Sequence, residues 1–320
     1  MLQKRLIVLF RSTHKHFQQR NKSDVGFIGI GNMGQRMATN LIKKGRTVKV
    51  YDASKTAAQT VAGAKVCATP QEAATDVDFV ITMLPDGDIV KKVLTAEDGV
   101  LKGIKKSALY VDSSTINPIT AQELHKITAG EGIQFLDAPV SGGVTGASAA
   151  TLTFMLGGSQ EIAKKVEPYL LQMGGRIMHC GGPGAGQIAK LCNNLILGIC
   201  MIGVAEGMNL GAKMGLDVKT LSQVVNTSTG RCWSSDTYNP VPGIMENVPS
   251  ADNYNGGFQV QLIAKDMALA SNVAVSCGAP IPLGSAAHQM YRTLAAYGKG
   301  NKDFGIVYQF LQGQLDSLPK

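Results

Sequence analysis

A lysine and an asparagine stand four residues apart at the start of a long and mostly apolar segment. Lys190 and Asn194 would share one face of a helix, because residues at positions i and i+4 are neighbours there. Burial in a cleft lowers the pKa of a lysine, so its neutral amine can accept a proton from a substrate hydroxyl. We therefore predict Lys190 as a general base, with Asn194 holding the lysine or the hydroxyl in line. The competing interpretation is an exposed lysine at a helix start.

Three glycines occur at a spacing that suits phosphate binding. Gly29, Gly31 and Gly34 form the sequence GIGNMG between a short apolar segment and an amphipathic one. After a strand and before a helix, such glycines allow a tight turn, close backbone approach to a pyrophosphate and close helix packing. The start of the helix adds free N–H groups and the positive end of its dipole. We predict a dinucleotide-binding site here, with Asn32 and Met33 also in contact with the ligand.

An acidic residue, Asp52, ends the second predicted strand, 23 residues after Gly29. A carboxylate at this position can bond both hydroxyls of the adenosine ribose and repel a 2′-phosphate, which predicts NAD rather than NADP. Later strand ends carry Leu84, Pro85 and Thr115. Because ligands bind at the carboxyl ends of the strands in such sheets, these residues are predicted to border the nicotinamide half.

A serine and two glycines follow another strand end, at Ser141, Gly142 and Gly143. Consecutive glycines allow backbone N–H groups to form an anion-binding concavity beside the serine hydroxyl. We predict that a substrate carboxylate binds there. A tight turn that packs against a second domain is the alternative interpretation.

These residues need a scaffold, and alternating strand and helix patterns from residue 24 to residue 186 predict one. Such alternation indicates a mostly parallel sheet covered on both faces. The expected fold class is α/β, with an N-terminal, doubly wound sheet of the Rossmann type. Strands are expected at 25–29, 47–51, 79–83, 109–112, 134–138, 151–156 and 176–179, and helices between them include 32–44, 118–129 and 160–173.

The pattern changes after the glycine-rich stretch 181–186. One long helix is predicted over 187–214, followed by further helices and by an irregular stretch at 227–257. We expect an NAD-binding domain over 24–186 and an all-α C-terminal domain over 187–320, joined by the long helix. The second domain would serve substrate binding and oligomerisation, and the cleft between the domains is where a small-molecule site is expected.

The first 23 residues carry six basic side chains and no acidic one. Their interleaved apolar, serine and threonine residues are typical of an amphipathic transit peptide sent to mitochondria, and a basic tail without an address is the alternative. The whole chain has a formal net charge of +8, but 25 basic and 23 acidic residues remain after this segment. The charge therefore gives no reason to expect a nucleic-acid partner.

The six cysteines form no CxxC pair and have no spacing that suits zinc. We predict reduced, mostly buried thiols and no metal site. The longest apolar run, at 195–205, has 11 residues, fewer than the roughly 18 needed to cross a bilayer. We therefore predict a buried core helix and no membrane partner.

Three segments coincide with a known family. They are DAPVSGGVTGA at 137–147, GQIAKLCNN at 186–194 and the pair Lys265 and Asp266 after Phe258. In this order behind GIGNMG, they resemble the β-hydroxyacid dehydrogenases. The resemblance implies hydride transfer from a small hydroxy acid to a nicotinamide cofactor, and it implies that Lys265 contacts both cofactor and substrate.

The resemblance extends over about residues 25–310 and favours one branch of the family. STGRCWSSDTYNPVPG at 228–243, DSSTINP at 112–118 and KDF at 302–304 are most similar to the members that oxidise 3-hydroxyisobutyrate to methylmalonate semialdehyde in valine breakdown. The resemblance implies NAD as cofactor. We also expect a homodimer or homotetramer in the mitochondrial matrix.

Two other functions stay open at this stage. An NADP-linked reductase of glyoxylate or succinic semialdehyde would use the same machinery, although Asp52 argues against it. A family member without activity would serve as a chromatin or nucleic-acid scaffold, but such a protein has no need of Lys190. The segment from Arg231 to Asn239, with Trp233, is expected to serve substrate specificity, a subunit contact or the anchoring of a loop.

Overall fold

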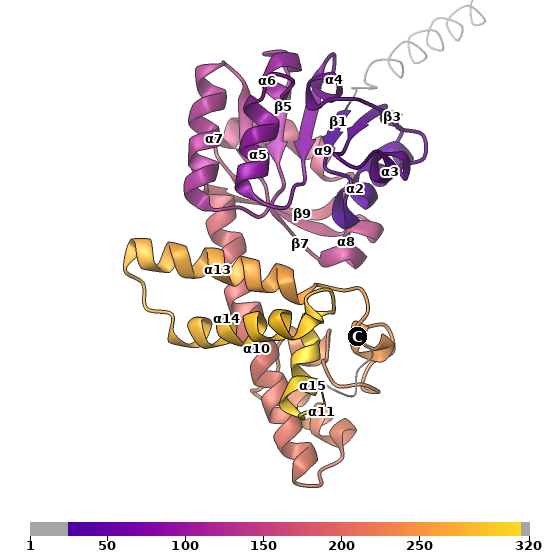
Figure 1. The fold of residues 1–320 in the computed structure, drawn as a ribbon, viewed down its shortest axis with the longest axis vertical. Helices are drawn as coiled ribbons and strands as arrows, with labels where there is room; N and C mark the ends of the chain where they lie inside the picture. The colour runs from indigo at the N-terminus through magenta and orange to yellow at the C-terminus, as the bar shows by residue number, and fades with distance from the viewer. Residues whose placement is uncertain (1–24, 315–320) are drawn as a thin grey trace, which may run out of the picture.

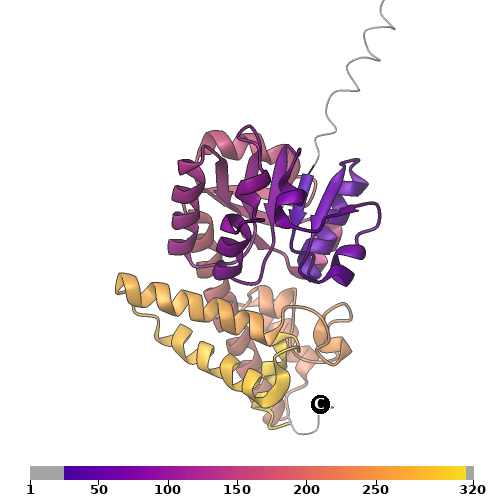
Figure 2. The same cartoon turned by 45° about the horizontal axis from the view of Figure 1, so that its top comes forward.

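The computed structural model describes residues 25–314 and places them in two units, one above the other in Figure 1. The upper unit holds a sheet and the helices around it, and the lower unit holds helices. Figure 2 shows the same division from a second direction. The predicted α/β unit followed by a helical one is confirmed. The predicted transit peptide, residues 1–23, lies outside the described residues.

Nine strands of the described chain form one sheet in the spatial order β3-β2-β1-β4-β5-β6-β8-β7, with β9 beside β8. Neighbours run parallel, except that β8 is antiparallel to β6 and β7. The order reverses between β1 and β4, which is where ligands bind in open parallel sheets. The strands are β1 Val25–Ile28, β2 Val48–Tyr51, β3 Lys65–Val66, β4 Phe79–Thr82, β5 Leu109–Asp112, β6 Gln134–Asp137, β7 Val140–Ser141, β8 Leu152–Gly157 and β9 Gly174–Gly181.

The mostly parallel sheet expected from the sequence is confirmed, with small differences in extent. The sequence pattern does not predict β3 and β7, because two residues are too few to show an alternation. The last strand is longer than predicted, since β9 follows β8 along its whole length.

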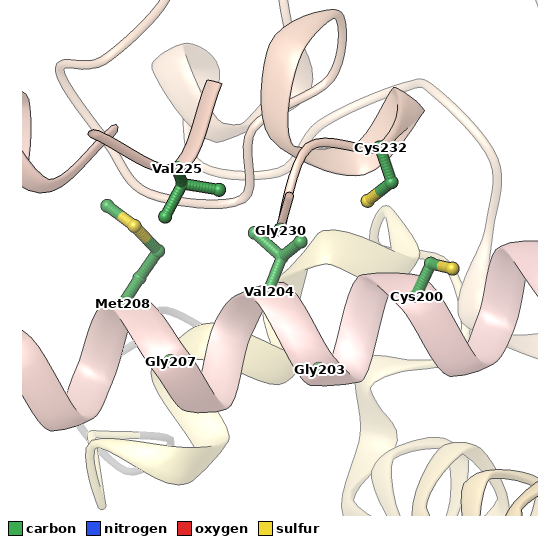
Figure 3. Close-up of a pocket in the computed structure, with 8 residues that line it drawn as sticks. All are labelled: Cys200, Gly203, Val204, Gly207, Met208, Val225, Gly230 and Cys232. Atoms are coloured by element: carbon green, nitrogen blue, oxygen red, sulfur yellow. The ribbon is translucent and has the colours of Figure 1, made fainter. Parts of the chain in front are cut away.

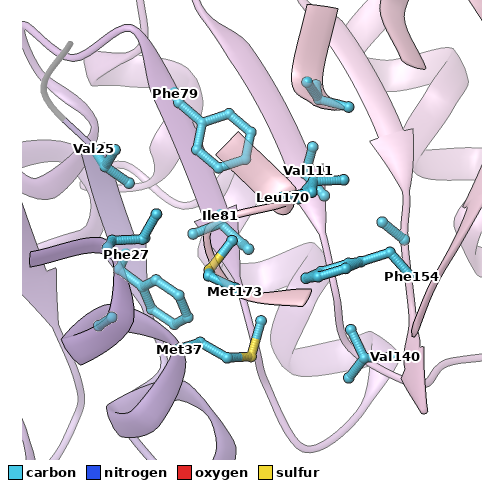
Figure 4. Close-up of a cluster of buried hydrophobic side chains, with 14 of the residues drawn as sticks. Val25, Phe27, Met37, Phe79, Ile81, Val111, Val140, Phe154, Leu170 and Met173 are labelled. Carbon is cyan, nitrogen blue, oxygen red and sulfur yellow. The ribbon is translucent and has the colours of Figure 1, made fainter. Parts of the chain in front are cut away.

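Alternate residues of the central strands pack on opposite faces of the sheet. Phe27 and Ile81 belong to one buried cluster, whereas Ile28 and Val80 belong to another. Burial on both faces explains why these strands are continuously apolar rather than alternating. Figure 4 shows the first cluster, where Met37 of α2 lies beside Phe27. Each fully buried side chain of this size stabilises the fold by about 2–3 kcal/mol relative to exposure.

Helices cover both faces of the sheet, as the strand sequences require. One cluster includes side chains of α2 and α9, and the other includes side chains of α4, α5, α6 and α7. The helices of this unit are α2 Asn32–Lys43, α3 Lys55–Gln59, α4 Pro70–Ala74, α5 Gly87–Thr95, α6 Val100–Gly103, α7 Pro118–Gly130, α8 Gly143–Ala149 and α9 Gln160–Leu170.

The lower unit is built around α10, which packs against α13, α14 and α15 and, at its start, against β8 and β9. Because α10 contacts both units, the predicted domain boundary near Gly186 stays a prediction. The stretch 227–257 is less irregular than predicted, since it holds α12 and the 3₁₀ turn η1. The helices are α10 Ala185–Lys213, α11 Val218–Thr227, α12 Trp233–Asp236, α13 Val260–Cys277, α14 Pro282–Leu294 and α15 Val307–Leu311, and short turns are η1 Pro249–Asp252, η2 Ala295–Lys299 and η3 Phe304–Ile306.

Two expectations about burial are wrong. In the described chain, α10 is the one helix long and apolar enough to cross a membrane by length and composition, yet only 33% of that apolar window is buried. It is therefore a central helix with an uncovered face rather than a buried core helix. The six cysteines are free as predicted, but Cys180, Cys192 and Cys277 are exposed, because they lie on open faces of β9, α10 and α13.

Candidate active site

A row of buried polar side chains joins α10 to α13. Lys190 Nζ donates to Asn194 Oδ1 at 3.0 Å, and Asn194 Nδ2 donates to Asp266 Oδ2 at 2.6 Å. Lys190 is 8% exposed, Asn194 1% and Asp266 3%. The predicted side-by-side placement of Lys190 and Asn194 is confirmed, and the exposed-lysine alternative is wrong. The row places an amine that can exchange a proton next to a fixed amide acceptor.

The pKa of the Lys190 amine lies below its ordinary value. Burial is the main cause, because the charged form loses its hydration. The positive charge of Lys265 lowers this pKa further, while the negative charge of Asp266 opposes the shift. The neutral amine is thus more accessible than that of a solvated lysine, as a general base requires.

Lys265, on the same helix as Asp266, crosses to the upper unit. Its Nζ donates to the backbone oxygens of Thr115 at 2.9 Å and Pro85 at 3.3 Å. It also lies 3.2 Å from Asp266 Oδ1. Lys265 therefore links the row on α10 to the two strand-end loops that were predicted to border a nicotinamide. Its functional role stays a prediction.

The GIGNMG turn has the geometry that a pyrophosphate needs. Gly29 has φ of +95°, and a Cβ there would lie 2.2 Å from the Met83 oxygen, so a side chain is excluded. A Cβ on Gly34 would lie within 2 Å of the Gly29 oxygen, which explains how closely α2 approaches β1. A Cβ on Gly31, in contrast, would meet nothing within 4 Å. The backbone at Gly31 is therefore open to a ligand.

Asp52 lies beside this turn, as predicted. Its Oδ2 accepts the Ile30 N–H at 2.7 Å, and its Oδ1 accepts the Ser54 N–H at 2.8 Å. Both bonds fix the carboxylate next to the turn and leave lone pairs on each oxygen. The N-cap residue of α2 is Gly31, which has no side chain to cap the helix, so within the described chain the N–H groups of exposed Asn32 and half-buried Met33 stay available. These residues fit a dinucleotide, with the pyrophosphate at the start of α2 and the adenosine ribose at Asp52.

The loops after β4 and β5 are joined by a buried polar network. Leu84 N–H donates to Ser114 Oγ at 2.8 Å, and Ser114 Oγ donates to Asp112 Oδ1 at 2.6 Å. Thr82 Oγ1 donates to the same Asp112 oxygen at 2.7 Å. Burial raises the pKa of Asp112 to about 6, although these hydrogen bonds oppose the shift. Leu84 and Thr115 are thus parts of one connected rim.

Ser141, Gly142 and Gly143 lie where the short strand β7 ends and α8 begins. The two glycines are exposed, with φ of +131° and +60°, so both adopt backbone conformations that favour glycine. In Figure 1, β7 and α8 lie at the edge of the upper unit that faces the lower one. Within the described residues, no hydrogen bond joins this turn to Lys190. Its role in binding a carboxylate stays a prediction.

Three residues of the site region were not assigned a role from the sequence. Asp266 was seen only as a neighbour of Lys265, yet it bonds Asn194. Gln187 is fully buried and bonds the loop after β5. Asp137 accepts the N–H groups of Gly184 and Gln187 at the start of α10. The signal for Gln187 is its position three residues before Lys190, on the same helix face.

The segment from Arg231 to Asn239 makes its contacts within the lower unit. Arg231 Nε pairs with Asp236 Oδ2 at 2.6 Å. The Trp233 ring stacks on the Tyr238 ring with centroids 4.6 Å apart, and the Tyr238 hydroxyl donates to Asp303 Oδ2 at 2.8 Å. These contacts support the anchoring of the segment to its own unit. Trp233 remains 47% exposed.

A hollow of about 330 Å³ lies further along α10, beyond Asn194, and Cys232 of the segment from Arg231 to Asn239 is among the residues that line it. Figure 3 shows Cys200, Val204 and Met208 on the α10 face that borders it, with Val225 and Cys232 opposite. Its lining is almost entirely apolar, and such a surface offers no group for proton transfer. Among the described residues, no group of three or more histidine, cysteine or acidic side chains could hold a metal ion.

Two family models match successive parts of the chain. The model described as the NAD binding domain of 6-phosphogluconate dehydrogenase matches residues 24–182. The model described as NAD-binding of NADP-dependent 3-hydroxyisobutyrate dehydrogenase matches residues 184–311. Both descriptions name NAD binding, and the second also names NADP dependence, so the two models do not distinguish the cofactors.

Similar proteins match almost the whole chain. The mitochondrial 3-hydroxyisobutyrate dehydrogenase of Bos taurus is 50% identical over 294 residues, which is 91% of this chain and 88% of the bovine protein. A probable mitochondrial 3-hydroxyisobutyrate dehydrogenase of Dictyostelium discoideum is 47% identical over 96% of each chain. The solved structure of Mycobacterium tuberculosis 3-hydroxyisobutyrate dehydrogenase with L-serine has a TM-score of 0.85, at 41% identity over 91% of this chain and 99% of that one.

Proposed function

The chain belongs to the β-hydroxyacid dehydrogenase family of NAD(P)-binding oxidoreductases, and we propose that it oxidises 3-hydroxyisobutyrate to methylmalonate semialdehyde with NAD. The relatives that match most of its length are named for this substrate. The observation that carries the proposal is the buried amine of Lys190, held by Asn194 and linked through Asp266 and Lys265 to the loops after β4 and β5.

We propose that Lys190 takes the proton of the substrate hydroxyl. A nicotinamide bound at the loops after β4 and β5 would supply the acceptor for the hydride of the alcohol carbon. The neutral amine of Lys190 accepts the hydroxyl proton in the same step, and the resulting ammonium is stabilised by Asn194 Oδ1 and by the nearby charge of Asp266. In the reverse direction the Lys190 ammonium donates this proton to the carbonyl oxygen. Asn194 keeps the amine in line, because its own amide is fixed by Asp266.

The substrate carboxylate is assigned to the turn at Ser141, Gly142 and Gly143. Exposed backbone N–H groups at two consecutive glycines and a neighbouring hydroxyl suit an anion. Lys265 adds a positive charge from α13, where it also bonds Thr115 and Pro85. A small acid would thus be held by its carboxylate while its hydroxyl faces Lys190.

NAD is proposed over NADP because of Asp52. Its carboxylate is fixed beside the GIGNMG turn by the Ile30 and Ser54 N–H groups, where it would accept ribose hydroxyls and repel a 2′-phosphate. Lys49, on the strand that precedes Asp52, is not directed at this position, since its Nζ donates to the Thr75 oxygen. One matching family model carries an NADP-dependent description, so the two cofactors must be compared directly.

The test is a panel of hydroxy acids assayed by the formation of reduced nicotinamide. The purified chain is given 3-hydroxyisobutyrate, L-serine, glycerate or 4-hydroxybutyrate, each with NAD and with NADP. We expect the highest kcat/KM for 3-hydroxyisobutyrate with NAD. A higher kcat/KM for another acid would show that 3-hydroxyisobutyrate is not the preferred substrate, and a preference for NADP would contradict the role given to Asp52. Absence of turnover with every acid would favour a non-catalytic scaffold.

We further propose a homodimer or homotetramer in the mitochondrial matrix. Ile196 and Leu210 of α10 are 62% and 65% exposed, and fourteen residues bring them back to nearly the same helix face. Such an uncovered apolar row supports association with another copy. The mitochondrial names of the relatives support the address. Sedimentation of the purified chain checks the first proposal, and import of the chain with and without residues 1–23 checks the second.

A further inference from the structure

One fully buried side-chain amide connects the start of α10 to the loop after β5. Gln187 Nε2 donates to the Ser114 oxygen at 2.8 Å, and Gln187 Oε1 accepts the Ile116 N–H at 3.0 Å. The two bonded groups flank Thr115, whose own oxygen accepts Lys265 Nζ at 2.9 Å. We call residues 112–116 the Ser114 loop. Two side chains from α10 and α13 therefore bond three successive residues of this loop.

The helix end that carries Gln187 is itself fixed. The Gln187 N–H donates to Asp137 Oδ2 at 3.1 Å, and the Gly184 N–H donates to Asp137 Oδ1 at 2.8 Å. His125 Nε2 lies 2.9 Å from the same carboxylate. A Cβ on Gly186 would lie 2.2 Å from the Met155 oxygen, so the helix already touches β8 and has no room to move closer. Gln187 thus extends from a rigid support.

The other end of the connection reaches the rim predicted to border the nicotinamide. Ser114 Oγ accepts the Leu84 N–H at 2.8 Å and donates to Asp112 at 2.6 Å. A shift of the Ser114 loop would therefore move Thr115 and, through Ser114, the segment at Leu84. Lys190 follows Gln187 by three residues on the same side of α10. The base and the rim consequently share one support.

We propose that Gln187 is a positioning residue that holds the nicotinamide-bordering rim in register with Lys190. The inference rests on the proposed function, in which Lys190 takes a proton while hydride moves to a nicotinamide beside Leu84 and Thr115. Gln187 touches neither of the reacting groups in this scheme. It acts by fixing the distance between the loop and the helix, to which hydride and proton transfer are both sensitive.

The chemistry of the amide explains why glutamine suits this position. One side chain must donate to a carbonyl and accept from an N–H, and the primary amide does both without charge. A methionine fills similar space but leaves the Ser114 oxygen and the Ile116 N–H unpaired in the interior. A glutamate can make both bonds only when it is protonated. As a carboxylate it would face the Ser114 oxygen without a donor.

The proposal is tested by the binding of two nucleotides to the full chain. NADH carries the nicotinamide, whereas ADP-ribose lacks it but has the same adenosine and pyrophosphate. For Gln187→Glu at pH 9 or above, where even a buried carboxyl group ionises, we expect NADH to bind at least about tenfold more weakly than to the wild type, with ADP-ribose affinity unchanged within about twofold. If the chain prefers NADPH, the pair becomes NADPH and 2′-phospho-ADP-ribose.

A matched control and a pH series separate positioning from a general loss of structure. Asn209 also lies on α10, about 30 Å along the helix from Gln187, and its Nδ2 donates to the Leu311 oxygen at 3.2 Å. Asn209→Leu removes a comparable amide bond and is expected to leave both affinities unchanged. Lowering the pH toward 5 should restore NADH binding to Gln187→Glu, because protonated glutamate can donate to Ser114. Gln187→Met should bind NADH weakly at every pH at which it is folded.

The outcomes are distinct from those of the substrate panel, since neither nucleotide titration needs a hydroxy acid. Equal weakening of NADH and ADP-ribose would show that Gln187 only maintains the fold, and this would overturn the proposal. Unchanged NADH binding in folded Gln187→Glu would overturn it as well. If Gln187→Met fails to fold, the pH series on Gln187→Glu still decides.

Discussion

Two stretches of α10 lie on the same helix and differ in what faces them. From Gln187 to Asn194, the helix bonds three other parts of the chain: the Gln187 side chain bonds the Ser114 loop, the Gln187 N–H bonds Asp137 of β6, and the Asn194 side chain bonds α13. From Cys200 to Met208, the helix borders a hollow of about 330 Å³ whose lining is almost entirely apolar. The first stretch has little free volume and many directed groups, whereas the second has volume and almost no directed group.

Convergent polar partners, rather than cavity size, therefore locate the proposed chemistry on this helix. An amine buried beside an amide and a carboxylate has an altered proton affinity, which an apolar hollow cannot provide. The hollow instead belongs to the uncovered side of α10, where apolar side chains such as Ile196 are exposed. Under the proposed function, one helix therefore presents a reaction centre at its start and an oligomer surface further on.

The largest contrast between the two stretches is expected from Lys190→Ala and Val204→Ala. Removing a general base should lower kcat by about 10²–10⁴-fold, while Val204→Ala in the hollow should leave kcat within about twofold. Initial rates with saturating 3-hydroxyisobutyrate and NAD measure both. NADH binding to Lys190→Ala should stay close to that of the wild type. Similar kcat values for the two variants would contradict the claim that the chemistry lies at 187–194 rather than at the hollow.

A smaller effect is expected when the amide of the row becomes a carboxylate. Asn194→Asp replaces the amide that donates to Asp266 with a carboxyl group, so these two carboxyl groups share one proton, and the carboxylate 3.0 Å from Lys190 Nζ stabilises the ammonium and raises the pKa of the lysine. At neutral pH, the kcat/KM of Asn194→Asp should be at least about tenfold below that of the wild type, and this ratio should recover as the pH rises. Asn194→Ala adds no charge and serves as the control, because its kcat/KM relative to the wild type should not recover with pH. A pH-independent loss in Asn194→Asp would contradict this coupling.

A substitution at Asp52 should change the preference between NAD and NADP and leave proton transfer to Lys190 unaffected. Asp52→Asn keeps an oxygen that can accept the Ile30 N–H but removes the charge that repels a 2′-phosphate. The ratio of kcat/KM with NAD to that with NADP should fall by about tenfold. The acidic limb of the pH profile should not move. An unchanged cofactor ratio would show that Asp52 does not select the nucleotide.

The smallest effect concerns stability near the rim. Burial raises the pKa of Asp112 from 3.8 to about 6, so the folded state holds a proton that the unfolded state has released between these pH values. The free energy of unfolding should therefore fall as the pH rises from about 4 to about 6, by about 3 kcal/mol at most. Asp112→Asn should remove this contribution, while the similar contribution of Asp303, whose pKa burial also raises to about 6, stays in both proteins. Denaturant titrations at pH 4 and pH 7 compare the two proteins. An equal change in the free energy of unfolding between these pH values in both proteins would contradict the raised pKa of Asp112.

Local patterns predict the parts of the site that depend on spacing along one element. The i and i+4 placement of Lys190 and Asn194 follows from helix geometry, and the GIGNMG turn follows from the steric needs of Gly29 and Gly34. The alternation of strands and helices similarly predicts the sheet and the helical unit after it, because each has a distinct hydrophobic period.

The remaining contacts depend on tertiary packing, which one sequence does not encode in any local period. The bond from Asn194 to Asp266 spans 72 residues, and the bonds from Gln187 to the Ser114 loop span at least 71. Burial of cysteines also depends on which helix faces are covered, so the exposed Cys192 on α10 could not be told from a buried one. The pair Lys265 and Asp266 drew attention only through the family resemblance.

The pH dependence of kcat/KM for 3-hydroxyisobutyrate tests most directly the claim that the neutral amine of Lys190 is the base. Because the protonated amine cannot accept the hydroxyl proton, activity should rise with pH through one ionisation and then level off. The midpoint should lie below 10.5, the ordinary value for lysine, since burial lowers this pKa. The residual activity of Lys190→Ala should lack this limb. A wild-type limb that persists unchanged in Lys190→Ala would contradict the account.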